Sequence, residues 1–295
     1  MDIYLTSITV FIVLTIIYFI VLKPTLTLDK LPEIVTDSSG NTSIKMDCFN
    51  DYKSSIFPKL ALYLLAVCLG QFILNTSYMN AKCGGTSKDN IGTAALYTIL
   101  PWTVIFGTML AVLVIFPGFK SAFSDVIGYF AVSGGAKDIF DAIMNTDLQK
   151  EIDTAKNNGN TTNVGDLEKA VKALTKMVDN NQSILINKMT PDNFADFWST
   201  LRPLMKPEVT TTSSIENDYK LQMLNLVVLK DNIGEAIWYI YTALLISSIV
   251  YYNLANVGCK KSVEQIKASH DEYVQQQQDA DQKAALNNSV QTSLS

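Results

Sequence analysis

The chain has 295 residues, of which 48% are hydrophobic and 17% are charged, and its formal net charge at pH 7 is −5. This acidic balance argues against a nucleic-acid-binding protein, which needs a basic patch to meet the phosphate backbone. The charged residues are unevenly spread along the chain, so its length is a poor guide to the number of domains.

Four windows of the sequence contain no Asp, Glu, Lys or Arg, and each is about as long as the roughly 20 residues that a helix needs to cross a bilayer. Inside lipid the backbone hydrogen bonds have to be satisfied within the segment, which favours helices. We therefore predict an all-α membrane protein with about four transmembrane helices and a helical soluble domain between the third and the fourth. The windows are residues 3–22, 60–81, 90–119 and 236–259.

The second window is more polar than the others, since it contains Gly70, Gln71 and Asn75. Two explanations are open. The span ends early, or these residues face other helices, where small and polar side chains support helix packing.

The windows and the turn-forming residues between them divide the chain into six segments. Residues 82–89 form a short turn, so the second and third spans are expected to make an antiparallel hairpin. Residues 34–36 and 43–46 could form short strands in the first loop. The predicted segments are a first transmembrane helix (1–23), a polar loop (24–59), a transmembrane hairpin (60–118), an amphipathic helix with a helical soluble domain (119–233), a fourth transmembrane helix (234–258) and a polar helical tail (259–295).

The stretch FPGFKSAFSDVIGYF, residues 116–130, follows the third span, which Pro117 and Gly118 end. On a helix its apolar residues share one face, and its polar residues gather on the opposite face. A break followed by an aromatic amphipathic helix is typical of a helix that lies in the membrane interface. The alternative is that this face packs on the soluble domain. The candidate membrane-interface residues are Phe119, Phe123, Val126, Ile127 and Phe130.

The soluble domain begins with a predicted hinge at Ser133, Gly134 and Gly135. A later helix is expected to expose Phe197, Trp198 and Arg202, the only arginine in the chain. These three residues are candidates for binding a protein partner, with Arg202 either holding a partner carboxylate in a bidentate contact or forming an ordinary surface ion pair.

A final long helix begins in the soluble domain with a capping box, Ser213-Ser214-Ile215-Glu216, and nothing breaks it strongly before the fourth span. The sequence therefore predicts that one rod connects the soluble domain to the membrane.

The four cysteines, Cys48, Cys68, Cys83 and Cys259, do not indicate a disulfide framework. Free thiols are the expectation. Two alternatives are open: a pair between Cys83 and Cys259, which lie on the same side of a four-span bundle, and acylation of Cys259.

The lysines give no consistent sidedness. Lys260 and Lys261 favour a cytoplasmic C-terminus, whereas five lysines in or beside the first loop favour a cytoplasmic loop on the opposite face.

A search for catalytic residues gives none. The only histidine, His270, lies in the polar tail, and no cysteine has a metal-ligand spacing. We predict no enzyme activity, no cofactor and no metal. A channel or transport subunit formed by an oligomer is the alternative function, with Gln71, Thr103 and Thr108 facing a pore, although the four windows hold no charged residue of the kind that marks ion sites.

Two short runs in residues 116–130, Phe-Ser-Asp at 123–125 and Ile-Gly-Tyr-Phe at 127–130, carry a resemblance. With the end of the preceding span, over residues 95–130, the segment resembles virion membrane proteins of large icosahedral DNA viruses that have an internal lipid membrane. The resemblance implies a minor capsid component that tethers this membrane to the capsid shell. The implied partners are the lipid bilayer and capsid proteins, with a homo-oligomer as a further possibility. The implied location is the internal membrane of the virion, with a host cell membrane as the alternative.

Overall fold

The structure of the protein is a computed structural model that describes residues 3–36, 42–83, 87–144, 182–259 and 263–292. Its elements are α1 (Ile3–Ile17), η1 (Tyr18–Leu22), η2 (Leu28–Lys30), β1 (Glu33–Thr36), β2 (Thr42–Lys45), α2 (Asp47–Cys83), α3 (Ser87–Pro101), η3 (Trp102–Phe106), α4 (Gly107–Ile115), η4 (Pro117–Lys120), α5 (Ser121–Phe123), η5 (Ser124–Gly128), α6 (Tyr129–Ile143), η6 (Gln182–Lys188), α9 (Phe194–Leu201), η7 (Arg202–Leu204), α10 (Pro207–Thr211), α11 (Ser213–Asn256) and α12 (Val263–Thr292).

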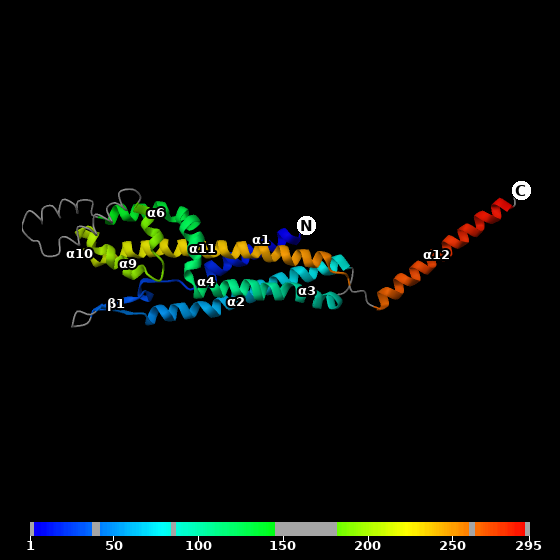
Figure 1. Ribbon diagram of the computed structural model, residues 1–295, viewed down its shortest axis with the longest axis horizontal. Coiled ribbons are helices and arrows are strands. Elements are labelled where there is room, and N and C mark those ends of the chain that lie inside the picture. The colour runs from blue at the N-terminus through cyan, green and yellow to red at the C-terminus, as the bar shows by residue number, and fades with distance from the viewer. Residues whose placement is uncertain (1–2, 37–41, 84–86, 145–181, 260–262, 293–295) are drawn as a thin grey trace, which may run out of the picture.

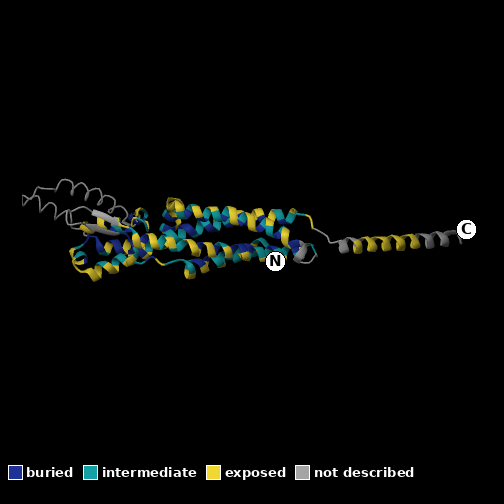
Figure 2. Ribbon diagram, turned by 90° about the horizontal axis from the view of Figure 1, so that it is seen from below, coloured by how far each residue is buried: buried dark blue, intermediate teal, exposed yellow. Residues whose placement is uncertain are grey.

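Four helical stretches are long and apolar enough to cross a membrane, which confirms the predicted all-α membrane protein. They lie side by side in one bundle (Figure 1), and exposed residues recur along them (Figure 2). Many of these exposed residues are large and apolar, such as Leu65, Leu96 and Leu245. Exposed apolar side chains are expected where lipid is the solvent. The stretches are Ile3–Leu22, Asp47–Cys83, Asn90–Ile115 and Ser213–Asn256.

Two hydrophobic cores are stacked along the long axis of the molecule, and α11 contributes to both. Met223, Leu224 and Val227 from its first half are buried in the core of the soluble domain. Residues of its second half, among them Tyr239 and Ile246, are buried in the core of the transmembrane bundle. A helix of 44 residues is about 66 Å long, so α11 runs through both parts as one rod. The continuous helix predicted from the sequence is therefore present.

The polar residues of the second span face other helices. The Gln71 side chain is buried and its Nε2 donates to the Ser7 carbonyl of α1 at 2.9 Å. Asn75 is also buried, and its Nδ2 donates to Thr98 Oγ1 of α3 at 2.9 Å. Of the two explanations for this polar window, packing between helices is the one that the structure supports, because α2 continues to Cys83.

The predicted polar loop 24–59 is shorter than expected. Its end is wrong, because α2 begins at Asp47, and the buried side chain of Phe49 in its first turn packs into the core of the soluble domain. Tertiary packing thus extends the helix beyond the apolar window, which the composition of the window could not indicate. The rest of the loop contains the short antiparallel hairpin of β1 and β2, in which Glu33 pairs with Lys45 and Thr36 with Thr42.

The predicted hinge at residues 133–135 is wrong. Gly134 and Gly135 lie inside the continuous helix α6, whose Val132, Ala136 and Ile139 are buried in the core of the soluble domain. Glycine disfavours a helix by about 1 kcal/mol relative to alanine, and the burial of this apolar face outweighs that preference. Residues 145–181 of the predicted soluble domain lie outside the described residues.

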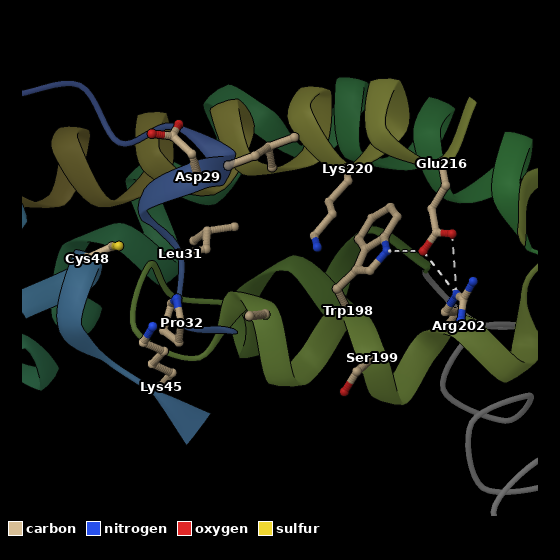
Figure 3. Close-up of a pocket in the computed structure, with 12 residues that line it drawn as sticks. Asp29, Leu31, Pro32, Lys45, Cys48, Trp198, Ser199, Arg202, Glu216 and Lys220 are labelled. Carbon is tan, nitrogen blue, oxygen red and sulfur yellow. Dashed lines mark hydrogen bonds and ion pairs between the residues drawn. The ribbon is translucent and has the colours of Figure 1, made fainter. Parts of the chain in front are cut away.

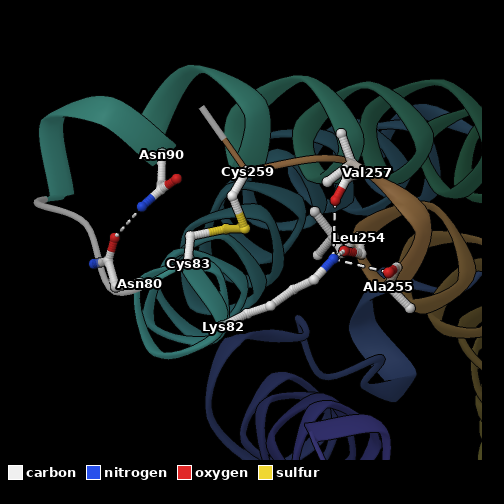
Figure 4. Close-up of a disulfide and its surroundings, with 8 residues drawn as sticks. All are labelled: Asn80, Lys82, Cys83, Asn90, Leu254, Ala255, Val257 and Cys259. Carbon is white, nitrogen blue, oxygen red and sulfur yellow. Dashed lines mark hydrogen bonds between the residues drawn. A yellow bond between two sulfur atoms is a disulfide. The ribbon is translucent and has the colours of Figure 1, made fainter. Parts of the chain in front are cut away.

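The expectation of free thiols is wrong for two of the four cysteines. Cys83, at the end of α2, and Cys259, after α11, form a disulfide with a Cα–Cα distance of 5.4 Å (Figure 4). Beside it, Lys82 Nζ donates to the carbonyl oxygens of Leu254, Ala255 and Val257, at 2.8, 2.8 and 2.9 Å. The ammonium group of Lys82 and the disulfide together hold the last turn of α11 against the end of α2.

The disulfide bears on the sidedness of the protein. It lies at the end of the bundle opposite the soluble domain, whereas Cys48, on the domain side, is an exposed free thiol. Since disulfides persist in oxidising compartments, we expect the disulfide end to face the oxidising side and the soluble domain to face the reducing side. This orientation agrees with the lysines of the first loop and not with Lys260 and Lys261.

The tail forms the helix α12, which extends away from the bundle (Figure 1). Its described side chains are mostly exposed, in agreement with their polar composition (Figure 2).

Candidate functional site at the membrane exit

Residues 116–130, called the exit segment below, connect the third span to the soluble domain. The chain turns at Pro117 after α4 ends at Ile115, and then passes through η4, α5 and η5 into α6. In Figure 1 this segment, drawn in green between α4 and α6, runs across the long axis of the bundle. This orientation at the end of a span is the one expected of a helix that lies along a membrane surface.

The polar side of the exit segment faces inward, against α11. Ser124 is buried, and a Cβ added to Gly128 would meet the Lys230 carbonyl oxygen at 2.6 Å. On α11, a Cβ added to Gly234 would meet the Ser124 backbone nitrogen at 2.8 Å. Two glycines therefore allow the exit segment and α11 to cross with their backbones almost in contact.

The apolar side of the exit segment faces outward. Phe130 is 76% exposed, and Phe119, Val126 and Ile127 are also exposed, so the described residues of the soluble domain do not cover this face. Phe123 differs because it is half-buried: its ring lies 5.0 Å from that of Trp238 on α11. Four of the five candidate membrane-interface residues thus form an exposed apolar face beside the ends of the spans. Their contact with lipid stays a prediction.

Lipid contact can be measured with a nitroxide label at position 130 in a Cys48→Ser background, in nanodiscs. We expect the label at 130 to collide more often with oxygen, which concentrates in the bilayer, than with a water-soluble nickel chelate. A label at Asn217, an exposed position on the domain half of α11, is the matched control and should show the opposite preference. Equal access of the chelate to both positions would contradict the interfacial assignment.

A cluster of four charged residues lies beneath the exit segment, and we call it the border cluster. Lys120 Nζ lies 3.0 Å from Asp231 Oδ2 and 2.8 Å from Glu235 Oε2. Lys23 Nζ lies 2.9 Å from the same Glu235 oxygen and donates to Asn232 Oδ1 at 2.7 Å. The Lys23 and Glu235 side chains are only 8% and 6% exposed. The cluster therefore connects the end of the first span, the exit segment and α11.

The surroundings change the pKa of both lysines. Burial lowers the pKa of Lys23, and the charge of Glu235 offsets this only in part. Burial alone would also lower the pKa of Lys120, but the carboxylates of Glu235 and Asp231 outweigh it and raise that pKa. The shared carboxylate of Glu235 is therefore central to the cluster, because both cations depend on it.

Sequence reasoning missed the border cluster, although the sequence contained a signal for it. Lys23, Lys120 and Glu235 are each the charged residue next to an uncharged window, on the domain side of its span. Charged residues at the same depth on neighbouring spans can form ion pairs. The signal was that the residues at the domain-side ends of three uncharged windows carry charges of opposite sign.

The three candidate partner-binding residues do not share one exposed surface. Trp198 is 2% exposed and belongs to the core of the soluble domain, so the expectation that its helix exposes it is wrong. The indole ring of Trp198 packs in the apolar core rather than on an exposed surface. Phe197 is half-buried, and Arg202 is exposed but forms an ion pair with Glu216, with Nε 3.1 Å from Oε1. Of the two interpretations of Arg202, the structure has the ordinary ion pair.

The candidate pore residues also lie on different faces. Gln71 points into the bundle and is bonded to Ser7, whereas Thr103 and Thr108 are exposed on its outer surface. Phe11, Trp102 and Phe106 fill the centre of the bundle, with ring centroids 5.4–5.6 Å apart. The three candidate pore residues therefore do not share one surface of the bundle.

Comparisons with protein families, with curated proteins and with solved structures gave no match to this chain.

Proposed function

We propose that this chain is a structural membrane protein that holds a helical domain at a fixed distance and orientation from one face of a bilayer, where the domain contacts other proteins. The observation that carries the proposal is α11, one uninterrupted helix that contributes to the cores of both the bundle and the domain. A helix shared by two cores couples them rigidly, whereas a flexible linker would let the domain move freely.

Two further features support a fixed domain. The border cluster and the crossing at Gly234 tie the start of the domain to the ends of the spans. If the exposed apolar face of the exit segment rests on the bilayer, it adds a third restraint, against tilting of the domain. None of these features has an obvious role in turnover or transport.

In its finer form, the proposal places the protein in the internal membrane of a virion, where it tethers this membrane to the capsid shell as a minor capsid component. This form rests on the resemblance of residues 95–130. It assigns capsid proteins as the partners of the soluble domain and lipid as the partner of the spans and the exit segment.

Crosslinking of purified particles and of membrane fractions with an amine-reactive reagent, followed by mass spectrometry, tests the proposal. We expect Lys137 and Lys188, which are exposed on the soluble domain, to crosslink to a capsid protein. A Lys188→Arg variant keeps the charge but removes the reactive amine, so it should lose only the crosslinks of that position. Particles that lack the protein should also lose the regular spacing between bilayer and shell.

Two outcomes would overturn the finer form: an unchanged spacing in such particles, or crosslinks only between copies of this chain in a cellular membrane. The second outcome would favour the alternative, an oligomeric four-pass channel, for which no described residue gives specific support. Ion flux above that of empty liposomes would then be required of the reconstituted protein.

A further inference from the structure

A pocket of about 550 Å³ lies in the soluble domain, between the loop before β1, the start of α2, α9 and α11 (Figure 3). This volume lies within the range of pockets that bind ligands or partner side chains, about 300–1,000 Å³. The residues that line it are Leu28, Asp29, Leu31, Pro32, Lys45, Cys48, Ala195, Trp198, Ser199, Arg202, Glu216 and Lys220.

The inner part of the pocket is apolar and its edge is polar. Leu31 and Trp198 are buried core residues whose side chains form the wall, whereas Ser199, Lys45 and Arg202 are exposed. An apolar centre with an exposed polar rim is the usual composition of a protein interface. Leu31 and Trp198 belong to the core of the domain and not to that of the bundle, so the pocket lies where a partner in the aqueous phase can reach it.

The charges that line the pocket do not cancel. Arg202 and Glu216 form an ion pair with each other, and Trp198 Nε1 donates to Glu216 Oε1 at 3.3 Å. The other charged residues that line the pocket are the exposed carboxylate of Asp29 and the two cations Lys45 and Lys220. The lining therefore has an excess of one positive charge in a chain whose net charge is −5.

Lys220 is the cation best placed to meet a ligand. Figure 3 shows its side chain reaching from α11 into the pocket, with the amine between Leu31 and Trp198. The residue is half-buried, and within the described part of the chain no hydrogen bond or ion pair joins its amine to another group, although the charge of Glu216, one helical turn earlier, acts on it (Figure 3). An ammonium group held among apolar side chains gains from a carboxylate in the same place, since the pair is less screened there than in water.

We propose that this pocket binds an acidic side chain of a protein partner, with Lys220 pairing with the carboxylate and Leu31 and Trp198 contacting apolar residues beside it. The occupant is thus a peptide segment in which Glu or Asp is flanked by apolar residues. The proposal rests on the function proposed above, because it names the surface through which the soluble domain contacts its partner.

Cys48 provides the measurement, because it lines the pocket and is an exposed free thiol, whereas Cys68 is buried and the other two cysteines form the disulfide. The rate of maleimide labelling of Cys48 is followed in the full chain in nanodiscs, with the peptide acetyl-Leu-Glu-Leu-amide added. At ten times its dissociation constant a ligand leaves about one site in eleven free, so labelling should slow about tenfold if the peptide covers the thiol.

Matched variants and probes separate the contribution of the peptide carboxylate from that of its apolar residues, and they test the role of Lys220. Acetyl-Leu-Gln-Leu-amide, which lacks the charge, should leave the rate unchanged. Lys220→Met should abolish the protection by the acidic peptide, Lys220→Arg should retain it, and Lys188→Met, at an exposed lysine outside the pocket, should not affect it. Octanoate serves as the free small carboxylate and should protect poorly, because it offers no flanking residue on the second side.

Three results would overturn the proposal: no protection by the acidic peptide, equal protection by the Gln peptide, or equal protection in Lys220→Met. Protection by octanoate alone would assign the pocket to a small carboxylate and not to a protein partner. The labelling assay contains neither particles nor capsid protein, so its failure leaves the crosslinking test of the tether unaffected, and the reverse also holds.

Discussion

Gly234→Ala is expected to destabilise the protein by about 2–3 kcal/mol, although alanine is normally the better helix residue. The added Cβ would lie 2.7 Å from the Ser124 Cβ, 2.8 Å from its backbone nitrogen and 2.9 Å from the Lys120 carbonyl oxygen. Two of these atoms belong to the backbone and cannot rotate away. The exit segment therefore has to move off α11, which also pulls Lys120 away from its carboxylates.

The matched control is Gly134→Ala. Gly134 also lies inside a helix, but a Cβ there meets nothing within 4 Å. Without a clash, the helix preference of alanine should stabilise the protein by about 0.5–1 kcal/mol. The two identical substitutions are thus expected to change stability in opposite directions. The measurement is the thermal midpoint of each variant in one detergent. A Gly234→Ala protein as stable as the wild type would show that the crossing is looser than described.

Glu235→Gln should have a larger effect, a loss of about 3–5 kcal/mol, because it removes the carboxylate that Lys23 and Lys120 share and leaves two buried cations with poorer partners. The substitution keeps the shape of the side chain, so the loss measures charge and not packing. We expect a much lower thermal midpoint and easier proteolysis at the junction of bundle and domain.

Two further variants test this explanation. Asp141→Asn removes the carboxylate of the exposed Lys137–Asp141 ion pair on α6. It should change the thermal midpoint little, because exposed pairs are screened by water and salt. Lys23→Met combined with Glu235→Leu removes a cation together with the carboxylate and leaves Lys120 its contact with Asp231. This double variant should be more stable than Glu235→Leu alone. If it is not, the loss comes from packing and the border cluster is not its cause.

The amino-acid sequence by itself determined the number of spans and the two faces of the exit segment. Both depend on local properties: uncharged windows of bilayer length, and the spacing of apolar residues along a helix. The long helix α11 was also predictable, because the pattern at residues 213–216 indicates a helix start and a single glycine is a weak interruption. The predicted capping box itself is not formed, since the N-cap is Thr212 and makes no side-chain cap hydrogen bond. The polar residues Gln71 and Asn75 left two explanations open in the sequence. One of them, packing against other helices, is the explanation that the structure supports.

Only the tertiary structure decided which residues meet across the bundle. The contact of Lys23 with Glu235 joins residues more than 200 positions apart, and the disulfide has a sequence separation of 176. Such pairs depend on how the helices pack, which no local pattern specifies. The same reason explains the failed expectation for Trp198, because the apolar side of its helix packs inside the domain. Packing also decided what the polar side of the exit segment meets: Gly128 on the segment, and Gly234 and Glu235 on α11, allow that side to lie against α11.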